Sequence, residues 1–274
     1  MKFKYIIIGF NILIILFLSV IVVTSVTLLG DSASKFWVSG WLPVCILLAA
    51  LIGLNVFFLY NRRLFLLLER EDWPALVDHL ERQVYERGRY SSRLVRLLAN
   101  SYMIMSDSAG VLRLEKKLSL AKPALLDSNA LIFGAAYILA GSPSAAAAFF
   151  SARLGKGRSR QPQWVRMFYG FSLLLSRAFD KAETEFRALA LSSDDAIITG
   201  LSSWFLSETL GKFSSNPKDC RALAEQGRRR LRKQLKKSED WRKEAAKIET
   251  GIHVAVIKKY IDQSEAWLFQ EEPA

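Results

Sequence analysis

The fold is decided by the stretch QWVRMFYGFSLLLSRAFDKAETEFRALALSSDD, residues 163–195. Its apolar residues recur every three or four positions on both sides of a short turn, which is the spacing of two amphipathic helices. Gly170 lies in the first helix, and Ala182 and Phe186 lie four residues apart in the second. Small residues let two helices approach closely and a large residue fills the gap beside them, so the stretch predicts a tightly packed α-hairpin.

The same pattern recurs with a nearly constant period. Gly134 lies 36 residues before Gly170, and Ala146 lies 36 residues before Ala182. No sustained alternation of apolar and polar residues indicates a strand. Residues 62–211 therefore predict a stack of α-hairpins, which is a solenoid. The other members of the series are Phe150, Gly110, Leu114, Leu76 and Leu80.

Two of these units resemble the tetratricopeptide repeat, a helix-turn-helix of about 34 residues. In residues 163–195, Gly170 matches the glycine of the family's first helix, Phe179-Asp180-Lys181-Ala182 its turn, and Phe186 the aromatic residue of its second helix. Arg153 and Leu189 stand where the family usually has a small residue, and both units lack the closing proline. The resemblance implies a TPR-like solenoid that binds other proteins, and an unrelated α-hairpin array is the alternative. The matching residues of unit 128–155 are Gly134, Tyr137, Gly141, Ala146 and Phe150.

Residues 1–61 contain two uncharged runs, at 5–29 and 36–60. At about 1.5 Å per residue, each run is long enough to cross the roughly 30 Å hydrocarbon core of a bilayer. A cleaved signal peptide is the rival interpretation of the first run, but signal peptides have apolar regions of only about 7–15 residues. We therefore expect a transmembrane helical hairpin before the solenoid.

The charges beside the spans predict the orientation. Lys2 and Lys4 precede the first span, Arg62 and Arg63 follow the second, and the connecting loop is nearly neutral. Because Lys and Arg collect on the cytoplasmic side, both termini are expected in the cytoplasm of a bacterium, with the spans in its inner membrane. A periplasmic C-terminal domain is the alternative. No helix breaker separates the second span from Arg70, so this helix should run on into the first hairpin.

Residues 212–274 are expected to form basic helices that cap the end of the solenoid. Residues 218–247 carry 12 Lys+Arg against 5 Asp+Glu, on a helix with a narrow apolar stripe. A solvated face, a site for anionic lipid headgroups, and a site for nucleic acid or an acidic protein are the three interpretations. No nucleic-acid motif accompanies the charge, so nucleic acid is the weaker of these partners. The candidate basic surface consists of Arg228, Arg229, Arg230, Arg232, Lys233, Lys236 and Lys237.

A second candidate surface is the concave face of the solenoid. In a TPR-like unit, the first helix lines this groove with the residues that flank its glycine. Here those residues are apolar, which suits an amphipathic helix from a protein partner. Packing against neighbouring helices of the same chain is the alternative. The candidate groove residues are Trp164, Met167, Phe171, Leu174, Leu131 and Ile138.

The chain offers little material for catalysis. Its 274 residues include 2 His and 2 Cys, and no metal-binding or nucleophile motif occurs. Gly155-Lys156-Gly157 resembles a phosphate-binding loop only in composition. We expect no catalytic residue, no metal, no cofactor and no enzyme activity.

The expected function is that of a membrane-anchored scaffold. It would mediate protein–protein interaction or assemble a membrane or envelope complex, such as a flagellar accessory structure. This expectation rests on analogy of architecture. The alternative is a membrane module that binds anionic lipid or nucleic acid through residues 218–247.

Overall fold

The computed structural model describes residues 2–29, 33–155, 161–248 and 251–270. Every regular element in those ranges is a helix, which confirms the predicted all-α class. The chain divides into two compact units, Met1–His79 and Leu80–Ala274. This division falls later in the chain than the boundary after residue 61 that we expected from the sequence.

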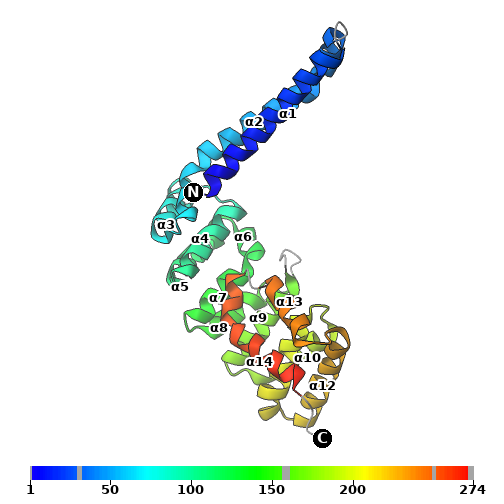
Figure 1. The fold of residues 1–274 in the computed structure, drawn as a ribbon. Helices are drawn as coiled ribbons and strands as arrows, with labels where there is room; N and C mark the ends of the chain where they lie inside the picture. Colours follow the sequence, from blue (N-terminus) through cyan, green and yellow to red (C-terminus); the bar gives the residue numbers. More distant parts are fainter. Residues whose placement is uncertain (1, 30–32, 156–160, 249–250, 271–274) are drawn as a thin grey trace. The chain divides into compact units, whose positions relative to one another are not determined.

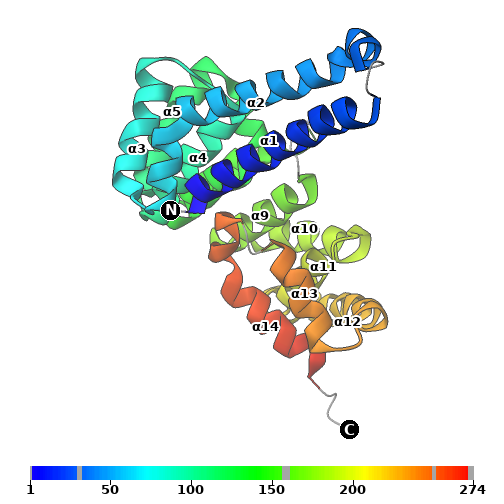
Figure 2. The ribbon, with the colours of Figure 1, turned by 45° about the horizontal axis from the view of Figure 1, so that its top comes forward.

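The first unit contains two long helices, α1 (Lys2–Leu29) and α2 (Ala33–Glu69), which pack as an antiparallel pair (Figure 1, Figure 2). The segments Ile8–Ser25 and Val44–Glu69 are long and apolar enough to cross a membrane, and almost none of their side chains is buried. Exposed apolar side chains along both helices suit contact with lipid. The predicted pair of apolar N-terminal helices is therefore confirmed.

A polar contact joins these two helices within their apolar surfaces. The Asn11 side-chain amide donates to Asn55 Oδ1 at 3.0 Å, and the Asn55 amide donates back to Asn11 Oδ1 at 2.8 Å. In hydrocarbon no water competes for such groups, so hydrogen bonds between side chains help to hold helices together. The pair therefore fixes how the two helices align along their length.

Replacement of Asn11 by alanine should weaken this helix pair by about 0.6 kcal/mol and by no more than about 1.7 kcal/mol, the average and the maximum measured for interhelical hydrogen bonds in a membrane protein. The free energy of unfolding of the full chain in mixed micelles measures the effect. Ser19→Ala is the matched control, because the Ser19 hydroxyl bonds only the Ile15 carbonyl of its own helix. Equal losses for the two variants would show that the Asn pair does not hold the helices together.

Helix α2 continues past Arg62 and Arg63 to Glu69 without a break, as the absence of a breaker predicted. The turn that follows contains Glu71, whose φ of 53° lies in the left-handed region. Helix α3 (Trp73–Glu81) begins after Asp72, whose carboxylate accepts a hydrogen bond from the Ala75 N–H at 3.2 Å. Asp72 therefore caps the N-terminus of α3.

The same helix ending occurs at four places in the chain. At each of them the main-chain N–H of the third residue after the helix bonds the carbonyl of the residue five positions earlier in the chain, and the residue immediately before this donor has a positive φ. The donor and acceptor pairs are Asp72 and Leu67, Asp107 and Tyr102, Ser142 and Tyr137, and Ala178 and Leu173. These endings lie 35, 35 and 36 residues apart, in agreement with the period read from the sequence.

This backbone pattern corrects one detail of the predicted register. The N–H of Ala146 bonds the Ser142 carbonyl, and the corresponding bond in the preceding hairpin joins Val111 to Asp107. Val111 therefore corresponds to Ala146, and Gly110 lies one position out of the series. Gly110 is nevertheless a helix-contact residue, because a Cβ atom added to it would lie 2.6 Å from the Tyr102 ring of the preceding helix. Residue size alone does not fix the register.

The second unit consists of successive α-hairpins that follow α3 and a short π-helical turn, Arg82–Glu86. Helices α4 and α5, α7 and α8, α9 and α10, and α11 and α12 form the pairs (Figure 1). A short helix, α6 (Pro123–Ser128), connects the first pair to the second. The bounds of the paired helices are α4 (Ser92–Ile104), α5 (Ser108–Ala121), α7 (Ala130–Leu139), α8 (Pro143–Ser151), α9 (Pro162–Leu175), α10 (Phe179–Ser192), α11 (Ala196–Trp204) and α12 (Pro217–Gln234).

Small and large residues meet between the helices of a pair, as the sequence predicts. A Cβ atom added to Gly134 would lie 1.9 Å from the Phe150 ring, and one added to Gly170 would lie 3.3 Å from the Phe186 ring. Glycine is therefore required where α7 crosses α8, and the fit is looser where α9 crosses α10. Ala182 is completely buried beside this second contact.

Replacement of Ala182 by leucine should lower the free energy of unfolding by about 1–3 kcal/mol, because a well-packed core has no room for added methylene groups. Thermal unfolding of the full chain in detergent measures the loss. Ala222→Leu, at an exposed alanine of α12, is the matched control and should cause little change. A stable Ala182→Leu variant would show that the contact between α9 and α10 is misplaced.

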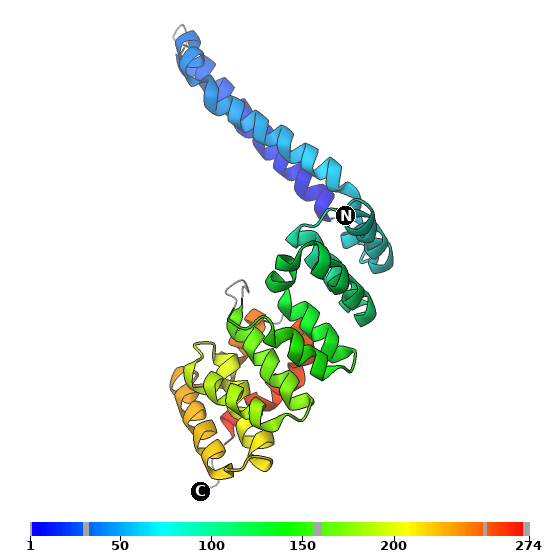
Figure 3. The same cartoon turned by 180° about the vertical axis from the view of Figure 1, so that it is seen from behind.

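The C-terminal segment folds back along the array. Helix α13 (Ser238–Ile248), the 3-10 turn Ile252–Val256 and α14 (Lys258–Phe269) pack on the first helices of the hairpins, α4, α7, α9 and α11. We call the face lined by these four helices the inner face. Figures 1 and 3, seen from opposite sides, show α14 along one face of the array.

This arrangement differs from the expected cap of residues 212–274. Helix α12 completes the last hairpin with α11, so only the part of the chain after α12 is left to pack elsewhere. That part carries Trp241, Ile257, Ile261 and Leu268, all of which are buried. The inner face is the surface that buries them, whereas a polar end cap would leave them in water.

Candidate interaction surface

The predicted groove residues lie on α7 and α9, but the structure does not leave them open. Trp164 is 5%, Met167 0% and Phe171 2% exposed. Leu131 and Leu174 are also buried, and Ile138 is half-buried. The expectation of an unoccupied groove at these residues is therefore wrong, and packing within the same chain is the correct interpretation.

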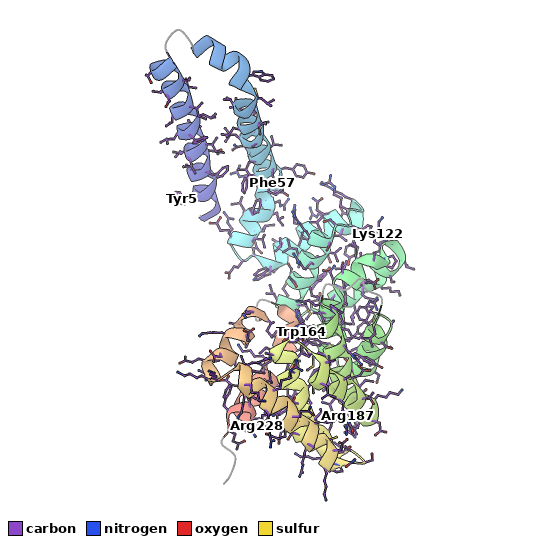
Figure 4. The ribbon with its side chains drawn as sticks, turned by 90° about the vertical axis from the view of Figure 1, so that its right-hand side faces the viewer. Tyr5, Phe57, Lys122, Trp164, Arg187 and Arg228 are labelled. Atoms are coloured by element: carbon purple, nitrogen blue, oxygen red, sulfur yellow. The ribbon has the colours of Figure 1, made fainter. Side chains whose placement is uncertain are left out.

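Different neighbours cover the three largest of these residues. The Trp164 indole N–H donates to Asp195 Oδ2 at 3.0 Å, and the Met167 sulfur accepts a hydrogen bond from the Ser202 hydroxyl at 3.7 Å. These two side chains therefore join α9 to the start and the middle of α11. Phe171 faces α14 instead, with its ring centre 5.3 Å from that of Tyr260. Figure 4 labels Trp164 within the second unit.

Tyr260 is the main contact of α14 with the inner face. Besides Phe171, its ring meets Trp204 at 5.7 Å and Phe205 at 5.2 Å between ring centres. Aromatic pairs at such distances add about 0.5–1.5 kcal/mol each beyond the apolar area that they bury. The inner face is thus an apolar, aromatic surface that receives a helix, and the helix seated on it belongs to the same chain.

The predicted basic surface separates into two groups. In the first, Arg228 and Arg232 donate to the carbonyl oxygens of Leu268 and Gln270 at the end of α14. The third member, Arg230, donates to the carbonyls of Leu191 and Ser193 at the end of α10, at 2.9 and 2.8 Å. A helix end carries partial negative charge and unpaired carbonyls, so guanidinium groups stabilise it. These three arginines are structural.

The second group remains available to solvent. Arg229, Lys233, Lys236 and Lys237 are exposed, and Arg229 is 3.5 Å from the carboxylate of Glu225. The apolar stripe on the opposite side of α12 is docked, because Gly227, Leu231 and Leu235 are buried. The basic surface of α12 is thus narrower than its composition predicts, because its charged residues do not all face water.

Two polar features of the second unit lay beyond sequence reasoning. Arg187 joins α10 to α12, because its guanidinium donates to Asp219 Oδ2 at 2.5 Å and to Cys220 Sγ at 3.3 Å. His253 lies against Phe168 with 5.8 Å between ring centres, and burial lowers the pKa of its imidazole to about 4. Glu183 and Arg187 lie four residues apart on one helix, a spacing that predicts an ion pair. The sequence does not indicate the contacts of Arg187 with α12 or of His253 with Phe168.

The described residues contain no group of three or more His, Cys, Asp or Glu side chains that could hold a metal ion. Lys156 and Gly157 of the Gly-Lys-Gly stretch lie outside the described residues. Three surfaces stand out in the described chain: the exposed apolar helices, the inner face and the basic side of α12.

Fold and surfaces define an all-α protein in which two long apolar helices precede an array of α-hairpins. The chain belongs to the family described as an uncharacterised Treponema protein, which matches residues 110–270. That match begins in α5 and extends through α14, so it includes most of the inner face and the helix seated on it.

An uncharacterized protein of Treponema pallidum (strain Nichols) is 32% identical to this chain over 165 residues. The similar region covers 60% of this chain and 52% of the relative, so the match spans about half of the relative's length. No solved structure matches the chain.

Proposed function

We propose that this protein is a membrane-anchored adaptor that binds other proteins and organises a membrane or envelope complex. Helices α1 and α2 would span the bacterial inner membrane, and the hairpin array would hold the partner in the cytoplasm. The observation that carries the proposal is the inner face, an apolar surface of the right shape for a helix, on which Tyr260 and its aromatic neighbours show how a helix is received.

A TPR-like solenoid is the form of array that we propose. Its support is the helix ending that recurs at intervals of 35, 35 and 36 residues, together with the close contacts of Gly134 with Phe150 and of Gly170 with Phe186. In a solenoid each hairpin packs mainly on its neighbours, so one extended face is built from equivalent helices. Extended faces of this kind are suited to binding other proteins.

Capture of a partner from membranes tests the adaptor proposal. The full chain, tagged and extracted in detergent, should retain a protein at a fixed ratio after a wash in high salt. The variant Arg229→Gln/Lys233→Gln/Lys236→Gln/Lys237→Gln should retain the same protein, because exposed charges affect association rate and salt dependence more than affinity.

The opposite result favours the second candidate function. If only anionic lipid or nucleic acid is recovered, if salt removes it, and if the four-residue variant does not bind it, the exposed basic side of α12 is the functional surface. The specific support for this alternative is the exposure of Arg229, Lys233, Lys236 and Lys237. Each such residue near an anionic membrane contributes about 1 kcal/mol.

Topology is tested separately. Reporter fusions after Phe65 and after Ala274 should both report the cytoplasm, because Lys2, Lys4, Arg62 and Arg63 flank the two spans. Two exported reporters would place the hairpin array in the periplasm and leave the adaptor role to be tested there. One reporter on each side would mean that a segment between Phe65 and Ala274 crosses the membrane, and would overturn the predicted two-span topology.

A further inference from the structure

The C-terminal end of α14 is held by hydrogen bonds to its main chain and by side-chain contacts. The Arg228 guanidinium lies over the Trp267 ring, 5.2 Å from its centre, and the Glu265 carboxylate accepts hydrogen bonds from Ser238 and Arg242 of α13. Arg228 donates to the Leu268 carbonyl at 3.3 Å and to the Gln270 carbonyl at 2.5 Å. Arg232 donates to the same two oxygens, at 2.8 and 2.5 Å. Arg228 is 8% exposed, so the pair is fixed at this point of the second unit (Figure 4).

The hydrogen bonds of these two arginines go to the main-chain oxygens of residues 268 and 270, so they do not depend on the side chains at these positions. The last carbonyls of every helix lack partners within the helix, so any helix that ends at this point presents the same acceptors. Every helix also carries a partial negative charge at its C-terminal end. The arginine pair therefore recognises the end of a helix and sets where along the inner face the helix stops.

The apolar side of α14 also makes contacts that another helix could make. Tyr260, Ile261 and Leu268 lie on the buried side, whereas Asp262 and Gln263 are exposed. The buried Ser264 hydroxyl bonds the carbonyl of Ile261 in its own helix, at 2.8 Å, and not a group of the inner face. The inner face thus selects a helix that has an aromatic residue and, one and eight positions after it, aliphatic residues.

We propose that the inner face is the docking surface for an amphipathic helix of a protein partner, and that α14 occupies this surface until such a helix displaces it. The partner helix carries the same apolar spacing as Tyr260, Ile261 and Leu268, and it ends at the Arg228–Arg232 pair. This inference rests on the proposed adaptor function and names the surface and the kind of partner.

The covalent connection of α14 to the rest of the chain determines how tightly a helix added from outside can bind. A helix joined to its site by a short connection competes at an effective concentration in the millimolar range. A helix added from outside binds only the fraction of molecules whose site is open, so its apparent Kd rises in inverse proportion to that fraction. Weakening α14 within the chain should therefore strengthen the binding of an added helix.

The test uses the full chain in detergent and a labelled synthetic peptide of residues 257–270, IKKYIDQSEAWLFQ. Tyr260→Ala/Leu268→Ala in the chain should bind this peptide at least about tenfold more tightly than the unmodified chain, because the competing helix is weakened. Gln263→Ala, at an exposed position of α14, is the matched control and should bind like the unmodified chain. Adding Arg228→Gln/Arg232→Gln to the double variant should reduce peptide binding again.

A double variant that unfolds cooperatively and does not bind the peptide overturns the inference. Hydrogen exchange of the unmodified chain provides a second measurement that needs no variant. If α14 opens by itself, its amides should exchange at least about tenfold faster than those of the core of α9 and α11, through a local opening. Equal protection of all three helices would show that α14 is inseparable from the core, and would also overturn the inference.

These results are distinct from a failure of the adaptor role. If the peptide does not bind but the chain still captures a protein from membranes, the adaptor proposal stands and its binding surface lies elsewhere. If the peptide binds but the chain captures no protein, the inner face is a helix-binding surface that serves no adaptor role.

Discussion

Replacement of Trp241 by alanine is expected to lower the free energy of unfolding of the second unit by about 3–5 kcal/mol. Trp241 of α13 is completely buried, and a Cβ atom added to Gly200 of α11 would lie 2.4 Å from its ring. Truncation would therefore leave a cavity of the size of an indole where α13 meets the inner face. Denaturant unfolding of the full chain in detergent measures the change.

A second variant makes this prediction specific to the contact. Gly200→Ala alone should destabilise by about 1–3 kcal/mol, because the added methyl group overlaps the Trp241 ring. In the Trp241→Ala background the same methyl group enters the cavity, so its cost should disappear. Gly53→Ala is the control, since a Cβ there meets nothing within 4 Å. Additive losses from Gly200→Ala and Trp241→Ala would show that the two residues do not touch.

Acid is expected to destabilise the second unit through His253. Burial lowers the pKa of this histidine from 6.5 to about 4 in the folded chain. Between these two values the unfolded chain binds a proton that the folded chain does not, so stability falls as the pH falls from 6.5 to 4. At about 1.36 kcal/mol per pKa unit the loss amounts to about 3 kcal/mol, and it levels off below pH 4.

His253→Phe should remove this part of the pH dependence, because phenylalanine keeps a ring beside Phe168 and cannot be protonated. His79→Gln, at the other histidine of the chain, is the control and should keep the slope of the unmodified chain. Unfolding free energies measured every half pH unit from 4 to 7 make the comparison. Identical slopes for His253→Phe and the unmodified chain would assign the acid effect to other groups.

Local patterns account for most of the fold. Apolar spacing of three and four residues predicts the helices, and small residues such as Gly134 and Gly170 predict where they cross. The uncharged runs predict α1 and α2. Each of these patterns lies within a short stretch of chain, so it can be recognised from the local sequence alone.

The occupant of the inner face could not be predicted in this way. Phe171 and Tyr260 meet although they lie far apart in the chain, and nothing in residues 257–270 distinguishes a helix that covers the array from one that ends it. The arginines of α12 were misassigned for a related reason. Arg228 and Arg232 contact backbone oxygens, which every residue carries, so their acceptors leave no mark in the sequence. Asn55 is the same kind of case, a long-range partner of Asn11.

The return of the C-terminal segment to the inner face also sets an order of events during synthesis. The turn Ile252–Val256 contacts α4 and α7, the first helices of the two earliest hairpins of the second unit, but it leaves the ribosome well after both hairpins. Until then the aromatic surface around Phe171 and Phe205 has no cover, although the hairpins that carry it are already made. Such a transiently exposed surface attracts other apolar segments, so binding of a chaperone before α14 emerges would protect the nascent array from aggregation.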